Sequence, residues 1–402
     1  MRINSSETTM PCTRHSFWET QPVLQYDEAG HPTFPEGPIF APIPLSDVKQ
    51  DSYNLPSQYE WSTIDIDDDA TLANLHTFLS AHFDESPCAL TFTYSAAFLR
   101  WLLRAPGHIS SLHVAVRAKN SKNLVGFIAG VPISLRIKSA TLRVAVANLL
   151  CIHQKLRHKR LAPVLIKELV RRAQLQGIWQ GAYATYRDLP TPFCSSEWGE
   201  RLLNPKKLVD LAYIEMNDRI TTQLAVKMCR LPPAPETMGF RKMEPSDAAA
   251  VTRLLQEHLK RFGVAPLVDE HFVEHFLVPK EGVVDGYVVE NPETKEVTDF
   301  CSFVIHTKAI EGKSRYSVLK FAILFYYAAF GTPVCKLIKD VLVVAKMGGF
   351  DIVRAHGVMG NDAFLHKLLF RALPDANPVN YYLYNYRLRL ALEPHGLGLL
   401  LL

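Results

Sequence analysis

The sequence predicts a mixed α/β protein made of two tandem halves of similar plan. Its 402 residues, of which 48% are hydrophobic and 21% charged, suit a globular chain of two or three domains. Apolar spacing predicts the same order of elements twice: two helices, a hairpin, a strand, a helix and a strand. Between the two copies, the segment Arg230-Leu-Pro-Pro-Ala-Pro235 has three prolines in five residues, which interrupts any regular element.

The first half, residues 61–230, follows an arm. Residues 1–60 contain many prolines and glycines and little periodicity, so we expect them to be extended. The acidic run at 65–69 precedes apolar residues at helical spacing, and its carboxylates are interpreted as favouring a helix N-terminus rather than as metal ligands. We then expect a helix at 98–103, hairpin strands at 112–116 and 124–129, a strand at 144–152, a helix from Pro163 to Gly177 and a strand near 179–186.

The second half, residues 231–402, repeats this order. A helix opens at Ser246 and ends at Gly263, and a second helix is expected at 270–277. Alternating aromatic residues near the end of the chain predict a strand with one buried face rather than a stacking platform. The remaining expected elements are hairpin strands at 287–290 and 297–305, a strand near 320–327, a helix at 334–346, a strand at 351–355, and the aromatic strand with Tyr381, Tyr382, Tyr384 and Tyr386.

Composition limits the possible partners. The net charge of +4 is too small to indicate a nucleic-acid-binding protein, and the seven cysteines lack paired or metal-ligand spacing, which is typical of reduced thiols. His271-Phe-Val-Glu-His275 matches a zinc-peptidase pattern, but without a third ligand we interpret it as a chance match. The chain start has no apolar signal core and no stretch reaches membrane-span length. We expect a cytoplasmic monomer with no metal, no permanently bound cofactor and no integral membrane contact.

The most informative motif is the run from Asn148 to Ile166, where an apolar strand ends in a basic turn that opens a helix. The first amides of a helix lack intrahelical partners and lie at the positive end of its dipole, and Arg157, Lys159 and Arg160 lie close to them. This arrangement suits a pyrophosphate, although a solvated basic turn is the alternative. We favour the anion site because cations at a helix N-terminus oppose the dipole unless an anion is present.

Six dispersed segments together resemble one family. They are Phe17-Trp-Glu-Thr-Gln-Pro-Val23, Asn148-Leu-Leu-Cys-Ile-His153, Leu156-Arg-His-Lys-Arg-Leu-Ala-Pro-Val-Leu-Ile166, Leu203-Asn-Pro-Lys-Lys-Leu208, Lys346-Met-Gly-Gly-Phe-Asp351 and Tyr381-Tyr-Leu-Tyr-Asn-Tyr386. Over nearly the whole chain the sequence resembles the glycylpeptide N-tetradecanoyltransferase, or N-myristoyltransferase, family. The resemblance implies two GNAT-like halves related by pseudo-two-fold symmetry, with a saddle-like sheet flanked by helices. It places the acyl-CoA site in the arm and first half, and much of the peptide site in the second half.

The resemblance also implies an activity and a mechanism. The expected reaction moves a C14 acyl group from the co-substrate myristoyl-CoA to the N-terminal glycine amine of a protein or nascent chain, by direct attack on the thioester. The amides of Leu149 and Leu150 would stabilise the oxyanion, and the terminal carboxylate of Leu402 would act as the base. The apolar tail from Gly396 to Leu402 is therefore expected to be buried rather than frayed.

Site residues follow by matching the family motifs. At position 158 a histidine replaces the usual serine, which leads to the hypothesis that CoA affinity depends on pH. The residues expected by this match to bind the cofactor are Ser16, Phe17, Trp18, Leu149, Leu150, Cys151, Ile152, His158, Arg160, Leu161 and Ala162. The charges of the basic run add Arg157 and Lys159. The residues expected to bind the peptide are Phe92, Tyr94, Tyr183, Thr185 and Tyr384.

The peptide side departs from the family pattern. Ala184 stands in place of a threonine, Tyr186 in place of a glycine and Glu200 in place of a histidine. Thr93 replaces an acidic residue, and residues 374–378 replace a Gly-Asp-Gly loop. Three hypotheses follow: an active N-myristoyltransferase, a divergent paralogue that binds acyl-CoA without acylating peptides, and an acyltransferase of altered chain-length or acceptor specificity. The first is favoured because the cradle, the oxyanion amides and the terminal carboxylate occur together.

Overall fold

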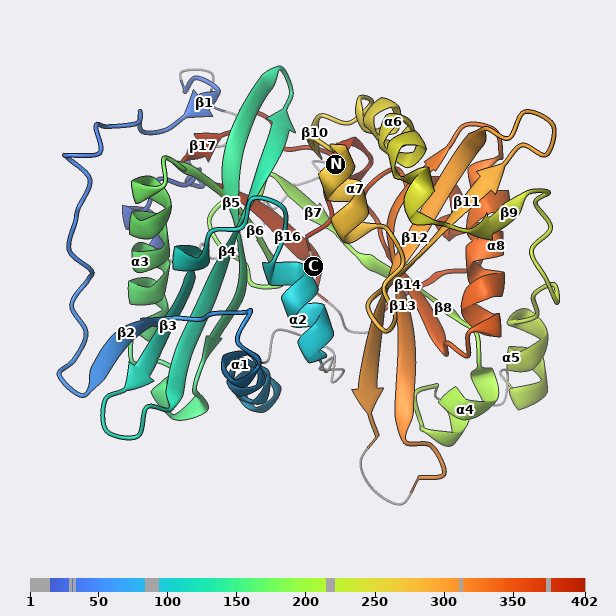
Figure 1. Ribbon diagram of the computed structural model, residues 1–402, viewed down its shortest axis with the longest axis horizontal. Coiled ribbons are helices and arrows are strands. Elements are labelled where there is room, and N and C mark those ends of the chain that lie inside the picture. Colours follow the sequence, from blue (N-terminus) through green and yellow to red (C-terminus); the bar gives the residue numbers. More distant parts are fainter. Residues whose placement is uncertain are drawn as a thin grey trace, which may run out of the picture.

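A computed structural model describes residues 15–28, 31, 34–83, 94–214, 221–310, 314–373 and 377–401. The helices and strands form two halves that lie side by side (Figure 1). Each half contains one large sheet with helices packed against it. The predicted α/β class with two halves of similar plan is confirmed.

The first sheet has the strand order β2-β3-β4-β5-β6-β16-β7, with β10 paired to the far end of β4. All its pairs are antiparallel except β5 with β6. The bounds are β2 (Tyr59–Thr63), β3 (His113–Ala118), β4 (Leu124–Ile137), β5 (Ala140–Ile152), β6 (Gln180–Thr185), β16 (Val379–Tyr384), β7 (Cys194–Ser196) and β10 (Val264–Pro266).

The second sheet repeats this pattern strand by strand, in the order β9-β11-β12-β13-β14-β8-β15. Its one parallel pair is β13 with β14, at the same place in the order as β5 with β6. This equivalence of order and direction is what a duplicated fold requires. The bounds are β9 (Phe240–Lys242), β11 (Val284–Glu290), β12 (Val297–Ala309), β13 (Val318–Ala329), β14 (Ile352–His356), β8 (Trp198–Leu202) and β15 (Arg371–Ala372).

The two halves exchange strands. β8 precedes the proline-rich segment in the chain but pairs with β14 in the second sheet, whereas β16 comes from the second half and pairs with β6 in the first sheet. Each sheet therefore contains strands from both sides of residue 230, the position at which the sequence suggested a boundary between the halves. One large buried cluster spans both halves, and a second, smaller cluster lies within the first half.

Helices cover the sheets near the predicted positions. Asp68 caps α1 by accepting a hydrogen bond from the Thr71 amide, so part of the acidic run does favour a helix N-terminus as expected. A short 3-10 turn, η4 (Pro245–Asp247), precedes α6. No described helix is both long and apolar enough to span a membrane. The helices are α1 (Asp69–His82), α2 (Ala96–Leu103), α3 (Leu161–Leu175), α4 (Pro205–Asp210), α5 (Thr222–Met228), α6 (Ala248–Leu259), α7 (Glu270–Phe276), α8 (Val334–Met347) and α9 (Asp362–Leu365).

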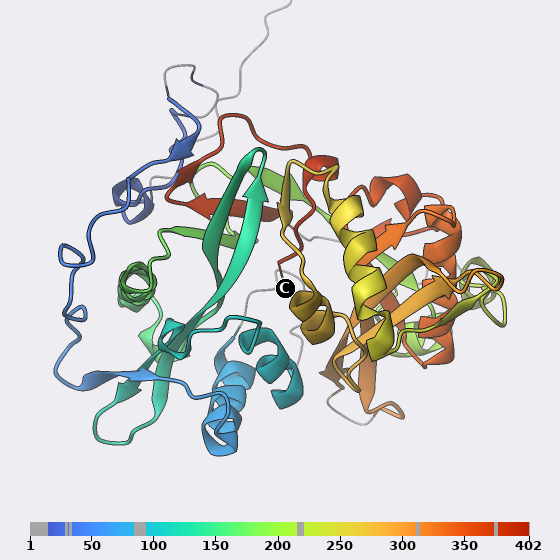
Figure 2. The same cartoon turned by 45° about the horizontal axis from the view of Figure 1, so that its top comes forward.

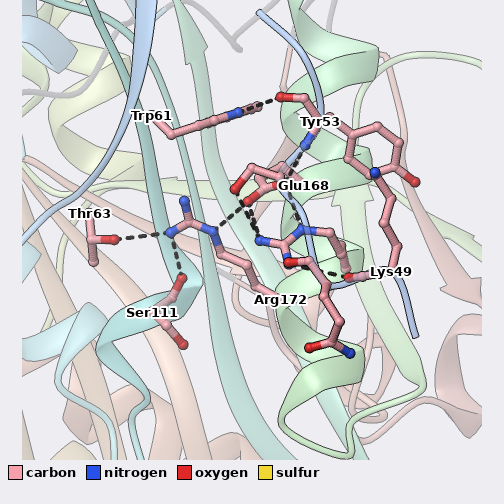
Figure 3. A network of polar contacts seen from close by, with 10 residues as sticks. Lys49, Tyr53, Trp61, Thr63, Ser111, Glu168 and Arg172 are labelled. Atoms are coloured by element: carbon pink, nitrogen blue, oxygen red, sulfur yellow. Dashed lines mark hydrogen bonds and ion pairs between the residues drawn. The ribbon is translucent and has the colours of Figure 1, made fainter. Parts of the chain in front are cut away.

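The arm runs along the outer side of the first half as an extended segment (Figure 1). Its short strand β1 (Gly37–Pro38) pairs with β17 (Tyr386–Arg387), near the end of the chain. Glu168 on α3 also fixes the arm, because its fully buried carboxylate accepts a hydrogen bond from the Tyr53 amide (Figure 3). Burial opposes ionisation of Glu168, but hydrogen bonds from Arg171 and Arg172 outweigh it and lower the pKa of this carboxyl group.

The C-terminal segment runs between the two halves (Figure 2). Leu397, Leu399 and Leu400 are buried, and the Gly398 amide donates a 2.8 Å hydrogen bond to the carbonyl oxygen of Val264. Gly398 also packs closely on Phe262, since a β-carbon at this position would lie 2.5 Å from the ring. The predicted burial of the tail is confirmed from Leu397 to Leu400, Leu401 is partly buried, and Leu402 lies outside the described residues.

Candidate active site

Strand β5 contains a bulge at the residues expected to stabilise the oxyanion. The register pairs Asn148 with Ala129 and Cys151 with Phe127, so Leu149 and Leu150 together oppose the single residue Ile128. Leu149 has φ of 57°, in the left-handed region that a leucine adopts only at a cost of about 1–2 kcal/mol. On the other side, the pairing with β6 ends at Val146. The bulge thus interrupts the regular ladder at these two residues.

The anion cradle predicted from the basic run lies directly after β5. Helix α3 begins at Leu161, and its N-cap residue Arg160 has φ of 59° and provides no side-chain cap. The first amides of α3 therefore have no capping side chain to satisfy them, which leaves them suited to an anion. The guanidinium of Arg157 donates a 2.5 Å hydrogen bond to the carbonyl oxygen of His82. Burial and the nearby charges of His153 and Arg157 lower the pKa of His82, which favours its neutral form.

A cavity of about 840 Å³ connects the cradle with the second half. It passes the β5 bulge, follows β6 and reaches strands β13 and β14. Leu401, the last described residue, also lines it. The same cavity therefore contacts the cradle, the bulge and the end of the chain.

Most of the predicted site residues line this cavity. From the cofactor set these are Ser16, Phe17, Trp18, Leu149, Leu150, Cys151, Ile152, Arg157, His158 and Ala162, and from the peptide set Tyr94, Tyr183, Thr185 and Tyr384. Lys159, Arg160 and Leu161 belong to the cradle turn but are not among the lining residues. Phe92 and Leu402 lie outside the described residues.

Aromatic residues of the arm close one wall of the cavity. Trp18, in the 3-10 turn η1 (Trp18–Thr20), stacks on Tyr183 with ring centroids 5.4 Å apart. Tyr183 stacks in turn on Tyr382, at 5.0 Å, and burial raises the pKa of the Tyr183 hydroxyl well above its ordinary value. The hydroxyl of Tyr384 donates a 3.2 Å hydrogen bond to Gln21. Tyr183, expected in the peptide set, thus contacts an arm residue expected in the cofactor set.

Sequence reasoning missed a polar network at the other end of the cavity. Arg354 on β14 and His306 on β12 line it. Burial, and to a smaller extent the charge of Arg354, lowers the pKa of His306 to about 3, so this histidine is neutral. Glu200 on β8, noted above only as a departure from the family, is fully buried beside Arg354. An arginine inside the apolar strand predicted at 351–355 is the signal that could have identified this site.

Only one histidine of the zinc-like motif has a packing role. His275 on α7 donates through Nε2 to the carbonyl oxygen of Trp101 at 2.7 Å, and the Trp101 indole donates back to the carbonyl oxygen of His275 at 3.0 Å. His271 is exposed and lies 3.5 Å from Glu274. Within the described residues, no cluster of His, Cys, Asp and Glu has the arrangement of a metal site.

In the second half, the positions that correspond to the bulge and the cradle are filled by side chains. The register of β13 passes over Phe325 and Tyr326 opposite Ser302, whose hydroxyl accepts from the Tyr326 amide at 3.2 Å and donates to the Tyr326 carbonyl oxygen at 2.8 Å. After β13, Asp299 accepts hydrogen bonds from the amides that precede α8. The second half thus has an equivalent bulge and an equivalent turn. The amides of Tyr326 and of residues 330–332 are, however, already hydrogen-bonded to side chains of the protein itself.

Comparison with known proteins identifies the family. The model for the N-terminal domain of myristoyl-CoA:protein N-myristoyltransferase matches residues 38–196, and the model for its C-terminal domain matches residues 210–396. The chain belongs to the N-myristoyltransferase family. Glycylpeptide N-tetradecanoyltransferase 1 of Arabidopsis thaliana is 49% identical to it over 96% of this chain and 89% of that relative, and glycylpeptide N-tetradecanoyltransferase 2 of Bos taurus is 39% identical over 93% and 74%.

A solved structure supports the same assignment. The crystal structure of Saccharomyces cerevisiae N-myristoyltransferase with bound myristoyl-CoA matches this chain with a TM-score of 0.88 at 31% identity. The match covers 95% of this chain and 94% of the yeast chain. The fold expected from the dispersed motifs is therefore confirmed over nearly the whole chain.

Proposed function

We propose that this chain transfers a myristoyl group from myristoyl-CoA to the N-terminal glycine amine of proteins. The observation that supports this most directly is the single cavity that contacts the anion cradle, the β5 bulge and the C-terminal segment. An acyl-CoA needs a pyrophosphate site and a thioester site within one molecule's reach, and an acceptor amine needs a base near the thioester. The membership of the chain in the N-myristoyltransferase family agrees with this use of the cavity.

In the proposed reaction the glycine nitrogen attacks the thioester carbonyl carbon. A carbon–nitrogen bond forms, the carbon–sulfur bond breaks, and CoA leaves as a thiolate that takes up a proton. The carbonyl oxygen gains negative charge in the transition state. The amides of Leu149 and Leu150 would stabilise it, because they lie at the bulge, where the ladder is interrupted. Losing one such donor typically costs about 3–4 kcal/mol of transition-state stabilisation.

The proposed base is the carboxylate of Leu402. An α-amine has a reference pKa of about 8, so it must lose a proton to become nucleophilic near neutral pH. The residues just before the terminus support this role, because Leu399 and Leu400 are buried and Leu401 lines the cavity. The described chain therefore reaches the cavity one residue before the proposed base.

The cradle would hold the pyrophosphate of CoA through the first amides of α3 and the side chains of Arg157 and His158. The arm residues Phe17 and Trp18 would cover the bound acyl-CoA. We further propose that the protein works as a monomer in the cytoplasm, on mature or nascent chains that begin with glycine.

Mass spectrometry of a glycine-started peptide incubated with myristoyl-CoA tests the proposal. A peptide of the same sequence with an acetylated N-terminus is the matched control, because it lacks only the nucleophile. A myristoyl mass gain on the free amine and none on the control is the expected result. Measurable binding of myristoyl-CoA without any product would instead support the divergent acyl-CoA-binding paralogue, and product formed only with other acyl chains or acceptors would support altered specificity.

A further inference from the structure

One asparagine near the end of the chain holds the arm at two separate points. Asn385 connects β16 to β17, and its backbone amide donates a 2.7 Å hydrogen bond to the carbonyl oxygen of Pro22. Its side-chain Oδ1 accepts a 2.8 Å hydrogen bond from the amide of Phe40, and its Nδ2 donates one of 3.1 Å to the carbonyl oxygen of the same residue. Two stretches of the arm that are distant in the sequence thus meet at a single residue.

The same side chain also contacts the wall of the cavity. Nδ2 of Asn385 donates a second hydrogen bond, also of 3.1 Å, to the carbonyl oxygen of Trp179, which precedes β6. Trp179 and Tyr384, the residue before Asn385, both line the cavity. The asparagine itself is 3% exposed. It therefore joins the arm to the cavity wall from inside the protein.

The backbone of Asn385 limits which residues can occupy this position. Its φ of 55° lies in the left-handed region, which glycine, asparagine and aspartate adopt at the least cost. Of these three, only asparagine supplies an acceptor oxygen together with two donor hydrogens. Asparagine therefore meets both the conformational and the hydrogen-bonding requirement of this turn.

Pro22 is the point through which Asn385 acts on the cavity. The 3-10 turn η1 lies directly before it, and the amide of Gln21 closes this turn with a 3.0 Å hydrogen bond to the carbonyl oxygen of Trp18. Few rotatable bonds thus separate Trp18 from the fixed backbone at Pro22. Holding Pro22 in place limits the movement of Trp18, which lines the cavity.

We infer that Asn385 is a positioning residue for the co-substrate, which holds the arm so that Trp18 covers the bound acyl-CoA. A segment that is already ordered loses less conformational entropy when it closes on a ligand, so the ligand is held more tightly. The side chains of Val23 and Leu24 are buried and also fix the arm, so loss of the Asn385 side chain should loosen the arm rather than release it. The inference rests on the proposed function, because it concerns the acyl-CoA site.

The test measures how fast a fluorescent acyl-CoA analogue dissociates from the whole chain when it is displaced by excess myristoyl-CoA. Asn385→Gly tolerates the same backbone conformation and keeps the backbone hydrogen bond to Pro22, but it loses the side-chain hydrogen bonds. We expect its dissociation rate to rise by roughly tenfold, as for the loss of one or two ordinary hydrogen bonds. The single-turnover rate of acylation from bound myristoyl-CoA should be unchanged. Asn385→Asp loses the donors but keeps an acceptor, and its dissociation rate should rise as well.

Asn361→Ala is the matched control for a general loss of stability. Asn361 is also 3% exposed, and its Nδ2 donates a 2.8 Å hydrogen bond to the carbonyl oxygen of His356 within the second half. This variant should lose stability without faster dissociation of the acyl-CoA. Equal increases in the dissociation rate for Asn361→Ala and Asn385→Gly would overturn the inference.

A double-mutant cycle with Trp18→Ala tests whether Asn385 acts through the position of Trp18. If it does, Asn385→Gly should add little to the dissociation rate once Trp18 has been replaced. A merely structural role would leave the two effects independent, so that their fold-changes multiply, and this result would contradict the inference. If the parent chain does not bind acyl-CoA, the proposed function fails together with the inference. Normal binding with equal dissociation rates for the parent and Asn385→Gly overturns the inference alone.

Discussion

The Oδ1 atom of Asp299 accepts a 2.8 Å hydrogen bond from the amide of Gly331. The same oxygen accepts from the amides of Phe330 and Thr332, at 2.7 and 3.0 Å, and Asp299 is fully buried. These amides connect β13 to α8, at the position where the first half has its basic cradle between β5 and α3. Gly331 permits the approach, since a β-carbon there would lie 3.1 Å from the carboxylate. An internal carboxylate thus occupies the second copy of the anion site.

Replacement of Asp299 by alanine should destabilise the fold. Three amides would lose their acceptor, and the one of Thr332 is buried. An unsatisfied buried group costs about 1–3 kcal/mol, so we expect a loss of about 1–3 kcal/mol. Asp299→Asn keeps one acceptor oxygen and should cost less. Urea unfolding of the two variants and the parent measures the difference.

The parent protein should bind one myristoyl-CoA per chain, because the carboxylate of Asp299 fills the second copy of the anion site. Calorimetric titration measures this number, and a second site of similar affinity would contradict the idea that the second cradle is filled.

Stability should decrease when the pH falls below about 6.5, the reference pKa of histidine. Burial lowers the pKa of His113 to about 4 and those of His258, His306 and His356 to about 3. Because these folded-state pKa values lie below the unfolded value, the unfolded chain binds protons that the folded chain cannot. The stabilisation from neutral burial is complete above the unfolded pKa and is lost as the pH falls, by up to about 1.4 kcal/mol per histidine for each pH unit.

Urea unfolding between pH 7.5 and pH 5 checks this prediction. His356→Gln serves as a probe, since its ring is 1% exposed and it should flatten the acid slope by about one proton. An acid slope that is the same in the parent and the variant would count against the assignment of His356 as a buried neutral group.

Replacement of Arg160 by glycine should stabilise the free protein and weaken cofactor binding. Arg160 is exposed and has φ of 59°, a conformation that costs a residue with a side chain about 1–2 kcal/mol. Glycine relieves this strain but also gives the unfolded chain more conformational freedom. We therefore expect the free energy of unfolding to rise by up to about 1 kcal/mol. The loss of a cation at the cradle should raise the Kd for myristoyl-CoA. Lys159→Gly removes a neighbouring cation, and equal gains in stability for the two variants would argue against strain at Arg160.

The sequence predicted most helices and strands because their apolar periods are long and clear. The helices α3 and α8 fall within two residues of the expected bounds, whereas the hairpin strand expected at 124–129 continues to Ile137 as β4. The exchange of β8 and β16 was not predictable in this way, since period indicates that a strand exists but not which distant strand it pairs with.

The same difference between local and long-range features applies to the candidate site. Residues next to each other in the chain, such as Leu149 and Leu150 at the bulge, could be named from the motif. The network of Glu200, Arg354 and Arg371 could not, because its members come from three strands that only the fold brings together. Lys159 was expected at the cofactor site from its charge, but it is not among the residues that line the cavity.

The most direct test of the central claim compares two changes at Leu402 in single-turnover acylation of a glycine-started peptide. Leu402→Ala keeps a terminal carboxylate at the same place in the chain, whereas deletion of Leu402 moves the carboxylate back by one residue. We predict that the alanine variant retains activity, and that the deletion loses at least roughly 100-fold in rate, the usual contribution of a general base, while its affinity for myristoyl-CoA is unchanged. Full activity of the deletion variant would contradict the account.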